Sequence, residues 1–445
     1  MKTKQKRLLI MTLLVGISVF LYGSIGVNTD NIPYKKSIGK LIFLSDLAEF
    51  KLKTRNKTPE TFLNENQPLL LENGSIVYSK EQLKYILASF NILGCGGGGS
   101  YYDALTILNA MQQENVEVID IENTDDNKLY VVAGGMGQPS ALKSQIPETI
   151  ASIKIAINTL VDMKGIPLGG ILNVESGPVN GILAVLMAAE LGVPVVNADG
   201  GGRSVPSLTN LAYNYEEYPI SPVVLKPLDK STQKYTAEDA ADAEAQIGKF
   251  MAENNVKIAG LALWAQTGAE LKTSQIPQGS YSYAYEMGIY TNYTMSRGNP
   301  YYLEKFLKEN NRFISSNEET LLDYTIRNVE NRFDAIDITT DTKAIRAVNE
   351  NLLIRNKFES DTINNALATA PNLISFLIKG EDEDSKEVYF PYNNGDVEAM
   401  EASIGKSIYM LNSKAPSRVY YDPIQESFLS VLKAQIGYKG PVKPE

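Results

Sequence analysis

The sequence predicts an α/β amino-terminal domain with a mostly parallel sheet, followed by a β-rich carboxyl-terminal domain. Between about residues 79 and 220, patterns typical of helices and strands alternate, as in a parallel sheet covered by helices. Three glycine-rich segments, 94–99, 134–137 and 199–203, lie where predicted strands should lead into helices. Farther along, short apolar runs separated by turn residues favour β structure.

Apolar spacing defines the individual elements, because helices repeat every three to four residues and strands are short apolar runs between turn residues. In chain order, the first half gives helices at 79–93 and 104–111, strands at 116–119 and 129–133, a helix at 150–161, a strand at 170–174, a helix at 182–191 and a strand at 193–196. The second half gives strands at 223–225, 258–264, 324–329, 335–339 and 344–348, with helices at 240–254 and 302–309.

The length of 445 residues suggests two domains. We assign residues 79–220 to the α/β domain and residues 221–445 to the β-rich domain, with the option that the second packs back on the first. Residues 28–78 are interpreted as a stalk or accessory segment, since they are rich in Lys and Asn and show little periodicity.

Residues 1–27 have the form of a signal peptide or membrane anchor. Four basic residues precede residues 8–27, an uncharged and mostly apolar run about as long as a bilayer span. Ser24 and Gly26 are small residues before a candidate cleavage point. Either form would place the body outside the cytoplasm, secreted or tethered through residues 8–27.

Composition excludes several functional classes. The net charge of −10 argues against nucleic acid as a partner, because that binding depends on Lys and Arg at phosphates. The chain has no histidine, which excludes His-ligated zinc and a histidine general base. Cys95 is the single cysteine, so the chain has no internal disulfide and no cysteine metal cage. Proton transfer near neutral pH therefore falls to Asp, Glu, Lys, Tyr or Cys95.

The first glycine segment also matches a dinucleotide-binding fingerprint. Gly94, Gly96 and Gly99 have the G-x-G-x-x-G spacing, and Asp120 follows about twenty residues on. The fingerprint requires a preceding strand, whereas residues 85–93 read at least as well as a helix. A dinucleotide site is therefore kept as the weaker alternative.

Several stretches together resemble one family, the S-methyl thiohydantoin desulfurase-like proteins, also described as hydantoinase/oxoprolinase-like and mostly of unknown function. The matching stretches are 93–99, 133–137, 174–180, 191–206, 348–353, 370–374 and 437–438. The resemblance covers roughly residues 80 to 440. It implies an α/β amino-terminal domain, a β-rich carboxyl-terminal domain, and hydrolytic removal of a sulfur substituent from a hydantoin-type ring.

Hydrolysis of a cyclic amide needs an activated water and donors for the developing negative charge. Glu175 and Asp199 follow predicted adjacent strands and are candidates to activate water or to hold a divalent cation. Cys95, at a predicted helix start, is a candidate nucleophile. The alternative for Asp199 is a cap of its own turn, and for Glu175 a structural role.

Candidate substrate-binding residues surround these acids. The glycine-turn N–H groups supply donors, Arg203 could hold a carboxylate by two hydrogen bonds, amide side chains could bond ring amides, and Glu350 is a further acid. The predicted binding set is Gly96, Gly97, Gly98, Gly135, Met136, Gly137, Asn180, Arg203, Asn349, Glu350 and Asn351. The alternative for residues 349–351 is a plain turn.

Departures from the family pattern raise a second hypothesis. Ser207 replaces an acid, Asn197 stands where the family often has aspartate, and Ser100 follows the first turn where an acid is frequent. A catalytically degenerate surface protein, used for ligand binding or self-assembly as a homo-oligomer, is the alternative. A tyrosine-rich stretch suits such an interface, though half-buried tyrosines in a β-rich domain would also explain it: Tyr281, Tyr283, Tyr285, Tyr290, Tyr293, Tyr301 and Tyr302.

Overall fold

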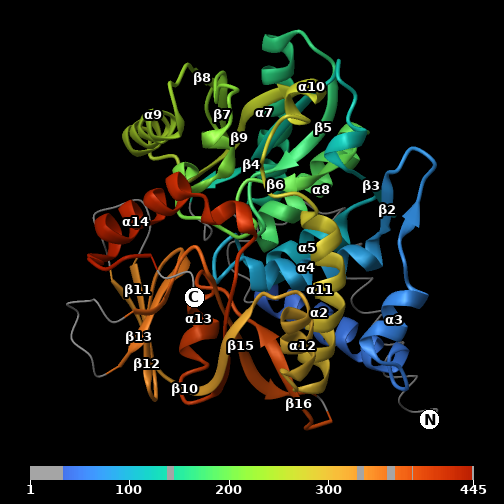
Figure 1. Ribbon diagram of the computed structural model, residues 1–445, viewed down its shortest axis with the longest axis vertical. Helices are drawn as coiled ribbons and strands as arrows, with labels where there is room; N and C mark the ends of the chain where they lie inside the picture. Colours follow the sequence, from blue (N-terminus) through green and yellow to red (C-terminus); the bar gives the residue numbers. More distant parts are fainter. Residues whose placement is uncertain (1–33, 138–144, 328–334, 358–365, 383, 443–445) are drawn as a thin grey trace.

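The computed structural model describes residues 34–137, 145–327, 335–357, 366–382 and 384–442. Two sheets organise them (Figure 1). The first sheet has nine strands in the order β1 (Leu69–Leu70), β2 (Ile76–Ser79), β3 (Asn115–Ile119), β6 (Val195–Asp199), β5 (Leu168–Asn173), β4 (Leu129–Gly137), β9 (Ile258–Thr267), β7 (Val223–Pro227) and β8 (Gln233–Tyr235). Its four central strands, β3, β6, β5 and β4, run parallel, and antiparallel strands flank them on both sides.

Helices cover this sheet in layers. Its helices are α4 (Lys80–Leu93), α5 (Tyr101–Ala110), α7 (Ile146–Lys164), α8 (Pro178–Leu191), α9 (Ala240–Glu253), α10 (Gly268–Leu271), α11 (Ser280–Arg297) and α12 (Tyr301–Glu309). Helix α7 packs on β9, β7 and β4, and helix α8 packs on β5, β4 and β3; α4 and α5 pack on α8, and α11 packs on α4. Helix α8 starts at Pro178 and ends at the left-handed Gly192, which are favoured residues at these positions. Because α8 lies between the sheet and other helices, nearly all its side chains are buried.

The second sheet is antiparallel and has eight strands. Its order is β14 (Ala366–Thr369), β13 (Glu350–Asn356), β12 (Lys343–Val348), β11 (Ala335–Thr340), β10 (Phe313–Arg327), β17 (Ser407–Ser413), β15 (Leu373–Glu381) and β16 (Glu387–Pro391). Helix α13 (Val397–Glu401) precedes β17, and the last helix, α14 (Asp422–Ile436), packs against both β12 and residues 208–210 of the α/β part. In Figure 1, α14 accordingly lies between the two sheets.

The predicted fold class is confirmed: an α/β part with a parallel centre precedes an antiparallel β part. The boundary differs from the sequence estimate, because β7, β8 and β9 lie beyond residue 220 and still belong to the first sheet. Strand β9 pairs with β4 over most of its length. The sheet to which β7, β8 and β9 belong is therefore set by pairing with distant segments, which the local sequence pattern does not predict.

Residues 34–78, within the predicted stalk or accessory segment, pack closely on the body. They form α2 (Tyr34–Lys53), α3 (Pro59–Glu65) and the hairpin of β1 and β2. The rings of Phe50 and Phe62 are buried, with centroids 5.4 Å apart, and the Phe50 ring lies 5.2 Å from that of Tyr293. The widely spaced aromatic residues therefore anchor a segment whose polar composition suggested a stalk.

The tyrosine-rich stretch lies on helices instead of strands. Tyr281, Tyr285, Tyr290 and Tyr293 are on α11 and are buried, whereas Tyr301 at the start of α12 is exposed. The hydroxyl groups of the buried tyrosines reach polar partners, as in the 3.0 Å bond from Tyr293 to a backbone carbonyl of the α2–α3 connection. Most of this stretch is therefore core of the α/β part.

Of the three glycine segments, only 199–203 follows a strand, β6. Segment 94–99 follows helix α4, and segment 134–137 is the end of strand β4 itself. Because a helix precedes Gly94, the dinucleotide fingerprint lacks the strand that it requires. Asp120, the acid of that fingerprint, accepts a hydrogen bond from the Asn197 amide at 2.7 Å.

The predicted signal or anchor segment, residues 1–27, lies outside the described residues. Among the helices that the structure does describe, none has the length and apolar character needed to cross a bilayer.

Candidate functional site

A cavity of about 130 Å³ lies where the end of β4, the start of α8 and the loop after β6 meet. This is about four times the volume of one water in the liquid, which suits a single small ring. Its lining comprises Gly98, Gly99, Gly134, Gly135, Met136, Gly137, Val174, Glu175, Val179, Asn180, Leu183, Val205, Pro206, Ser207, Leu208, Leu211, Glu244, Ile258, Leu261 and Asn349. The lining is mostly apolar, with carboxylates and amides at a few points, as in many ligand sites.

Glu175 is the buried acid of this cavity. It stands between β5 and α8 and is 5% exposed. Its Oε1 accepts from Asn180 Nδ2 at 2.8 Å, and its Oε2 accepts from the Val205 N–H at 2.7 Å. Burial raises the pKa of Glu175 to about 7, although both donors oppose this shift. A carboxyl that titrates near neutral pH is suited to transfer a proton.

Asp199 lies close to Glu175, but its carboxylate accepts hydrogen bonds from residues of the surrounding loops. Its Oδ1 accepts from the N–H groups of Gly201, at 2.8 Å, and Gly202, while its Oδ2 accepts from the Ser176 hydroxyl. The side chain is completely buried and is not part of the cavity lining. Burial raises its pKa, and these donors offset part of that rise. This geometry favours the turn-capping alternative over a catalytic role.

Arg203 is also completely buried, and its guanidinium is engaged by the protein. Nε donates to the Ser204 carbonyl at 2.8 Å, Nη1 to the Asn372 carbonyl at 2.5 Å, and Nη2 to the Asn351 carbonyl at 3.3 Å. Two of these partners belong to the β-rich part. Arg203 therefore ties the two parts together, which differs from the predicted anchoring of a substrate carboxylate.

The β-rich part covers half of the first glycine turn. The Asn394 N–H donates to the Gly96 carbonyl at 2.8 Å, and the Asn393 amide donates to the Gly99 carbonyl at 2.7 Å. Gly97 lies against Glu350 so closely that an added Cβ would collide with the carboxyl group. Gly98 and Gly99 line the cavity, whereas Gly96 and Gly97, predicted to bind substrate, face the seam between the two parts.

Glu350 stands in this seam behind the cavity. It is completely buried, its Oε1 accepts from Asn349 Nδ2 at 2.6 Å, and its Oε2 has no hydrogen-bond partner within the described part of the chain. Burial raises the pKa of Glu350 well above its usual range, and the charge of Glu175 raises it further while Arg203 lowers it. Burial therefore disfavours the ionised form of Glu350.

The amides predicted to bind ring atoms fall into two groups. Asn180 and Asn349 line the cavity, and Asn349 has the left-handed φ of 59° at the tip of the β12–β13 hairpin. Asn351 is buried and bonded within the seam: its N–H reaches the Cys95 carbonyl at 2.7 Å, and its amide reaches the Ile374 carbonyl at 2.9 Å.

Cys95 does not have the surroundings of a nucleophile. The thiol is completely buried, and its Sγ lies 3.4 Å from the Leu93 carbonyl and 3.9 Å from the Ser375 hydroxyl. Burial raises the pKa of the thiol, so the reactive thiolate is disfavoured. The helix-start argument fails because Cys95 follows the carboxyl end of α4, and α5 begins only at Tyr101.

One pair in the cavity wall was not predicted. Ser207 Oγ donates to Glu244 Oε2 at 2.7 Å, and the Leu208 N–H donates to Glu244 Oε1 at 2.9 Å. Glu244 sits within helix α9, where no local motif distinguishes it from other surface acids. Tertiary packing of α9 alone brings it to the cavity.

For a metal, the described residues offer no group of three Asp, Glu or Cys side chains arranged to hold one. The acid pair proposed for a cation, Glu175 and Asp199, is instead engaged by N–H, amide and hydroxyl donors. The chemistry that this site can perform with its own residues is proton transfer at Glu175.

Comparisons with known proteins agree with this architecture. Residues 81–235 match the family model described as "S-Me-THD-like, N-terminal domain". The fold is similar to that of a crystal structure of a protein from Chromobacterium violaceum, with a TM-score of 0.66 and 24% identity, over 83% of this chain and 99% of that one. At this identity the likeness concerns the fold alone. No curated protein matches the chain in sequence.

Proposed function

We propose, from the premise that residues 81–235 belong to the S-methyl thiohydantoin desulfurase-like family, that the protein hydrolyses a small hydantoin-type or other cyclic amide ring. The observation that carries the proposal is Glu175, a buried carboxyl with a pKa of about 7 on a small cavity. A single five-membered ring fits the cavity volume of about 130 Å³. The named activity of the family, removal of a sulfur substituent, is one reaction of this class.

In this proposal Glu175 takes a proton from the attacking water and returns it to the leaving group. The bond formed joins the water oxygen to the ring carbon, and the bond broken joins that carbon to its sulfur or nitrogen substituent. Asn180 holds the carboxylate through Oε1 at 2.8 Å and fixes its orientation. The apolar walls would contact the faces of the ring.

The test is hydrolysis of S-methyl thiohydantoins, thiohydantoins, hydantoins and 5-oxoproline by the purified protein, followed by ring absorbance and by thiol release. Cys95 is completely buried, so a thiol reagent should register product with little background from the protein. We expect Glu175→Gln to lower kcat at least about 100-fold, the range for loss of a general base.

The rate of the unchanged protein should rise with pH through about 7, because the ionised form of Glu175 is the base. Asp126→Asn is the matched control, since that acid lies on the surface, 2.6 Å from Lys272. Equal turnover in the Gln and parent proteins would remove Glu175 from the mechanism.

The alternative is a ligand-binding protein of the same fold without catalysis. It is favoured by Asp199 and Arg203, both of which the protein engages internally. Calorimetric binding of ring compounds without any turnover would support it. In that case Glu175→Gln should change the binding affinity. Self-assembly would instead show as polymers in light scattering.

We also infer export, which rests on residues 1–27 of the sequence and not on the described structure. The basic start and apolar run would place the body outside the cytoplasm. Fractionation of cells that produce the full chain, compared with a chain lacking residues 1–27, tests this. Recovery of both forms in the cytoplasm would contradict it.

A further inference from the structure

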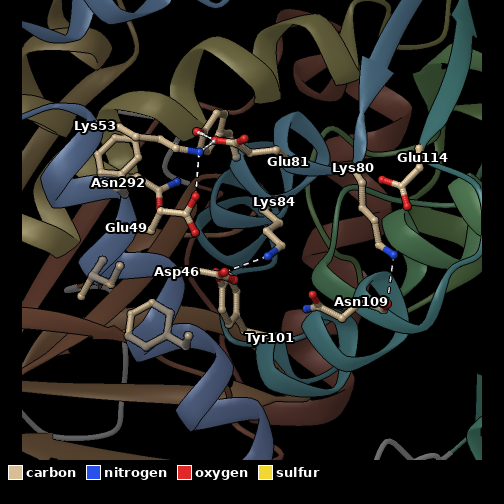
Figure 2. A pocket seen from close by; sticks show the side chains of 14 residues that line it. Asp46, Glu49, Lys53, Lys80, Glu81, Lys84, Tyr101, Asn109, Glu114 and Asn292 are labelled. Atoms are coloured by element: carbon tan, nitrogen blue, oxygen red, sulfur yellow. Dashed lines mark hydrogen bonds and ion pairs between the residues drawn. The ribbon is translucent and has the colours of Figure 1, made fainter. Parts of the chain in front are cut away.

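A second and larger cavity lies away from the glycine turns, between α2, the first turn of α4 and the end of α5 (Figure 2). Its volume of about 360 Å³ falls within the range of small-molecule sites, about 300–1,000 Å³. It shares no lining residue with the cavity of Glu175. Its lining comprises Phe43, Asp46, Leu47, Glu49, Phe50, Lys53, Lys80, Glu81, Lys84, Tyr85, Tyr101, Asn109, Glu114 and Asn292.

Two ammonium groups reach into one end of this cavity. In Figure 2 the side chains of Lys84 and Lys80 descend on either side of the opening, and the Asn109 amide points into it from below. Lys84 Nζ donates to Asp46 at 2.7 Å, and Lys80 Nζ donates to the carbonyls of Asn109, at 3.0 Å, and Met111, at 2.6 Å. An ammonium has three N–H donors, so each keeps at least one beyond these bonds.

The two ammonium groups also influence each other. Burial lowers the pKa of Lys80, Glu114 offsets part of this, and the charge of Lys84 lowers it further. An anionic group placed between Lys80 and Lys84 would relieve this repulsion and accept the remaining N–H donors. Glu114 also lies beside Lys80 at this end, and the remaining N–H donors of Lys80 and Lys84 are available to a carboxylate placed between them.

The other end carries carboxylates. Glu49 and Glu81 lie 2.9 and 2.6 Å from Lys53, and Asp46 stands between this group and Lys84 (Figure 2). The whole lining holds four carboxylates and three ammonium groups. A purely anionic ligand would face the carboxylates, and a purely cationic one would face the lysines. A ligand with one charge of each sign, set a few ångströms apart, matches both ends.

The remaining wall is aromatic and aliphatic. The rings of Phe43 and Tyr101 pack edge to face with centroids 5.8 Å apart, and Phe50 packs on Tyr85 at 5.7 Å. Leu47 completes this surface. Because these wall residues are already buried, the gain would come from burying the ligand's own apolar side chain against them.

We propose that the α2–α4–α5 cavity binds a free α-amino acid with an apolar or aromatic side chain, with its carboxylate between Lys80 and Lys84 and its ammonium group among Asp46, Glu49 and Glu81. The site is separate from the cavity of Glu175, and the proposal does not depend on the proposed hydrolysis.

The experiment is isothermal titration calorimetry of the full chain with L-leucine and L-phenylalanine, each compared with its N-acetyl and its amide form. The N-acetyl form lacks the ammonium and the amide lacks the carboxylate, so the unchanged protein can be used. We expect the free amino acids to bind and each blocked form to bind at least about tenfold more weakly, the loss for one good charged contact.

Variants locate the site. Lys84→Met and Lys80→Met should each weaken binding at least about tenfold. Lys272→Met, which breaks a surface ion pair with Asp126 away from the cavity, should leave affinity unchanged. Absence of binding, equal binding of the blocked forms, or unchanged affinity in folded Lys84→Met would each overturn the proposal.

Discussion

The two cavities differ in how far hydrogen bonds and opposite charges offset the burial of their carboxyl groups. At the glycine turns, Glu175 and Glu350 are buried with few opposing charges, so burial raises both pKa values. In the α2–α4–α5 cavity, burial raises the pKa of Asp46 despite its pair with Lys84, whereas hydrogen bonds from Lys53 and Tyr85 outweigh burial at Glu81 and lower its pKa. The comparison shows that burial and the number of partners together decide whether the pKa of an acid rises, as at Glu175 and Asp46, or falls, as at Glu81.

The largest expected effect is on the pH dependence of stability. Glu175 has an ordinary pKa of 4.5 when unfolded and about 7 when folded, so the folded state holds the extra proton between these values. Its contribution to stability is present below pH 4.5 and is lost as the pH rises to about 7, by about 3 kcal/mol at most. Urea unfolding of Glu175→Gln across this range should show a flatter profile than the parent. An unchanged slope would mean that Glu175 ionises normally in the folded protein.

The next effect concerns the fit of the first glycine turn to the β-rich part. Gly97→Ala places a Cβ against the buried Glu350 side chain, which must shift to make room, so we expect a loss of about 2 kcal/mol. The matched control is Gly135→Ala, whose Cβ would meet its nearest atom at 3.8 Å and should change stability by less than about 0.5 kcal/mol. Chemical denaturation measures both. Similar values for the two variants would show that the seam is loosely packed.

The smallest expected change in stability is in the α2–α4–α5 cavity. Lys84→Met removes a partly buried ion pair with Asp46, 2.7 Å long, and should cost about 1 kcal/mol. Asp46→Asn alone and the double variant complete a thermodynamic cycle. A coupling free energy close to zero would place this pair with ordinary surface ion pairs and would weaken the contrast between the two cavities.

The sequence was informative where local pattern determines structure. The capping box of Ser79 and Gln82 starts α4, and alternating apolar runs located β3, β4, β5 and β6. It was less informative where distant segments decide. Strand β9 joins the first sheet by pairing with β4, which lies about 130 residues earlier in the chain by the bounds of the two strands. No local sequence pattern predicts this pairing.

The same division applies to the candidate site. Glu175 and Asn180 share one strand-to-helix connection, so the sequence could place them together. Whether Arg203 and Cys95 face solvent or the other part of the chain depends on the docking of the β-rich part, which local sequence does not state. Glu244 was missed for the same reason, because α9 carries it to the cavity only in the folded protein.

The covered glycine turn also bears on when the site comes into being. Asn393, which bonds the Gly97 and Gly99 carbonyls, lies 296 residues downstream of Gly97. A ribosome must therefore make most of the chain before the segment that seals the turn exists. Nascent chains that stop short of it would leave the turn uncovered, so the complete site could form only near the end of synthesis.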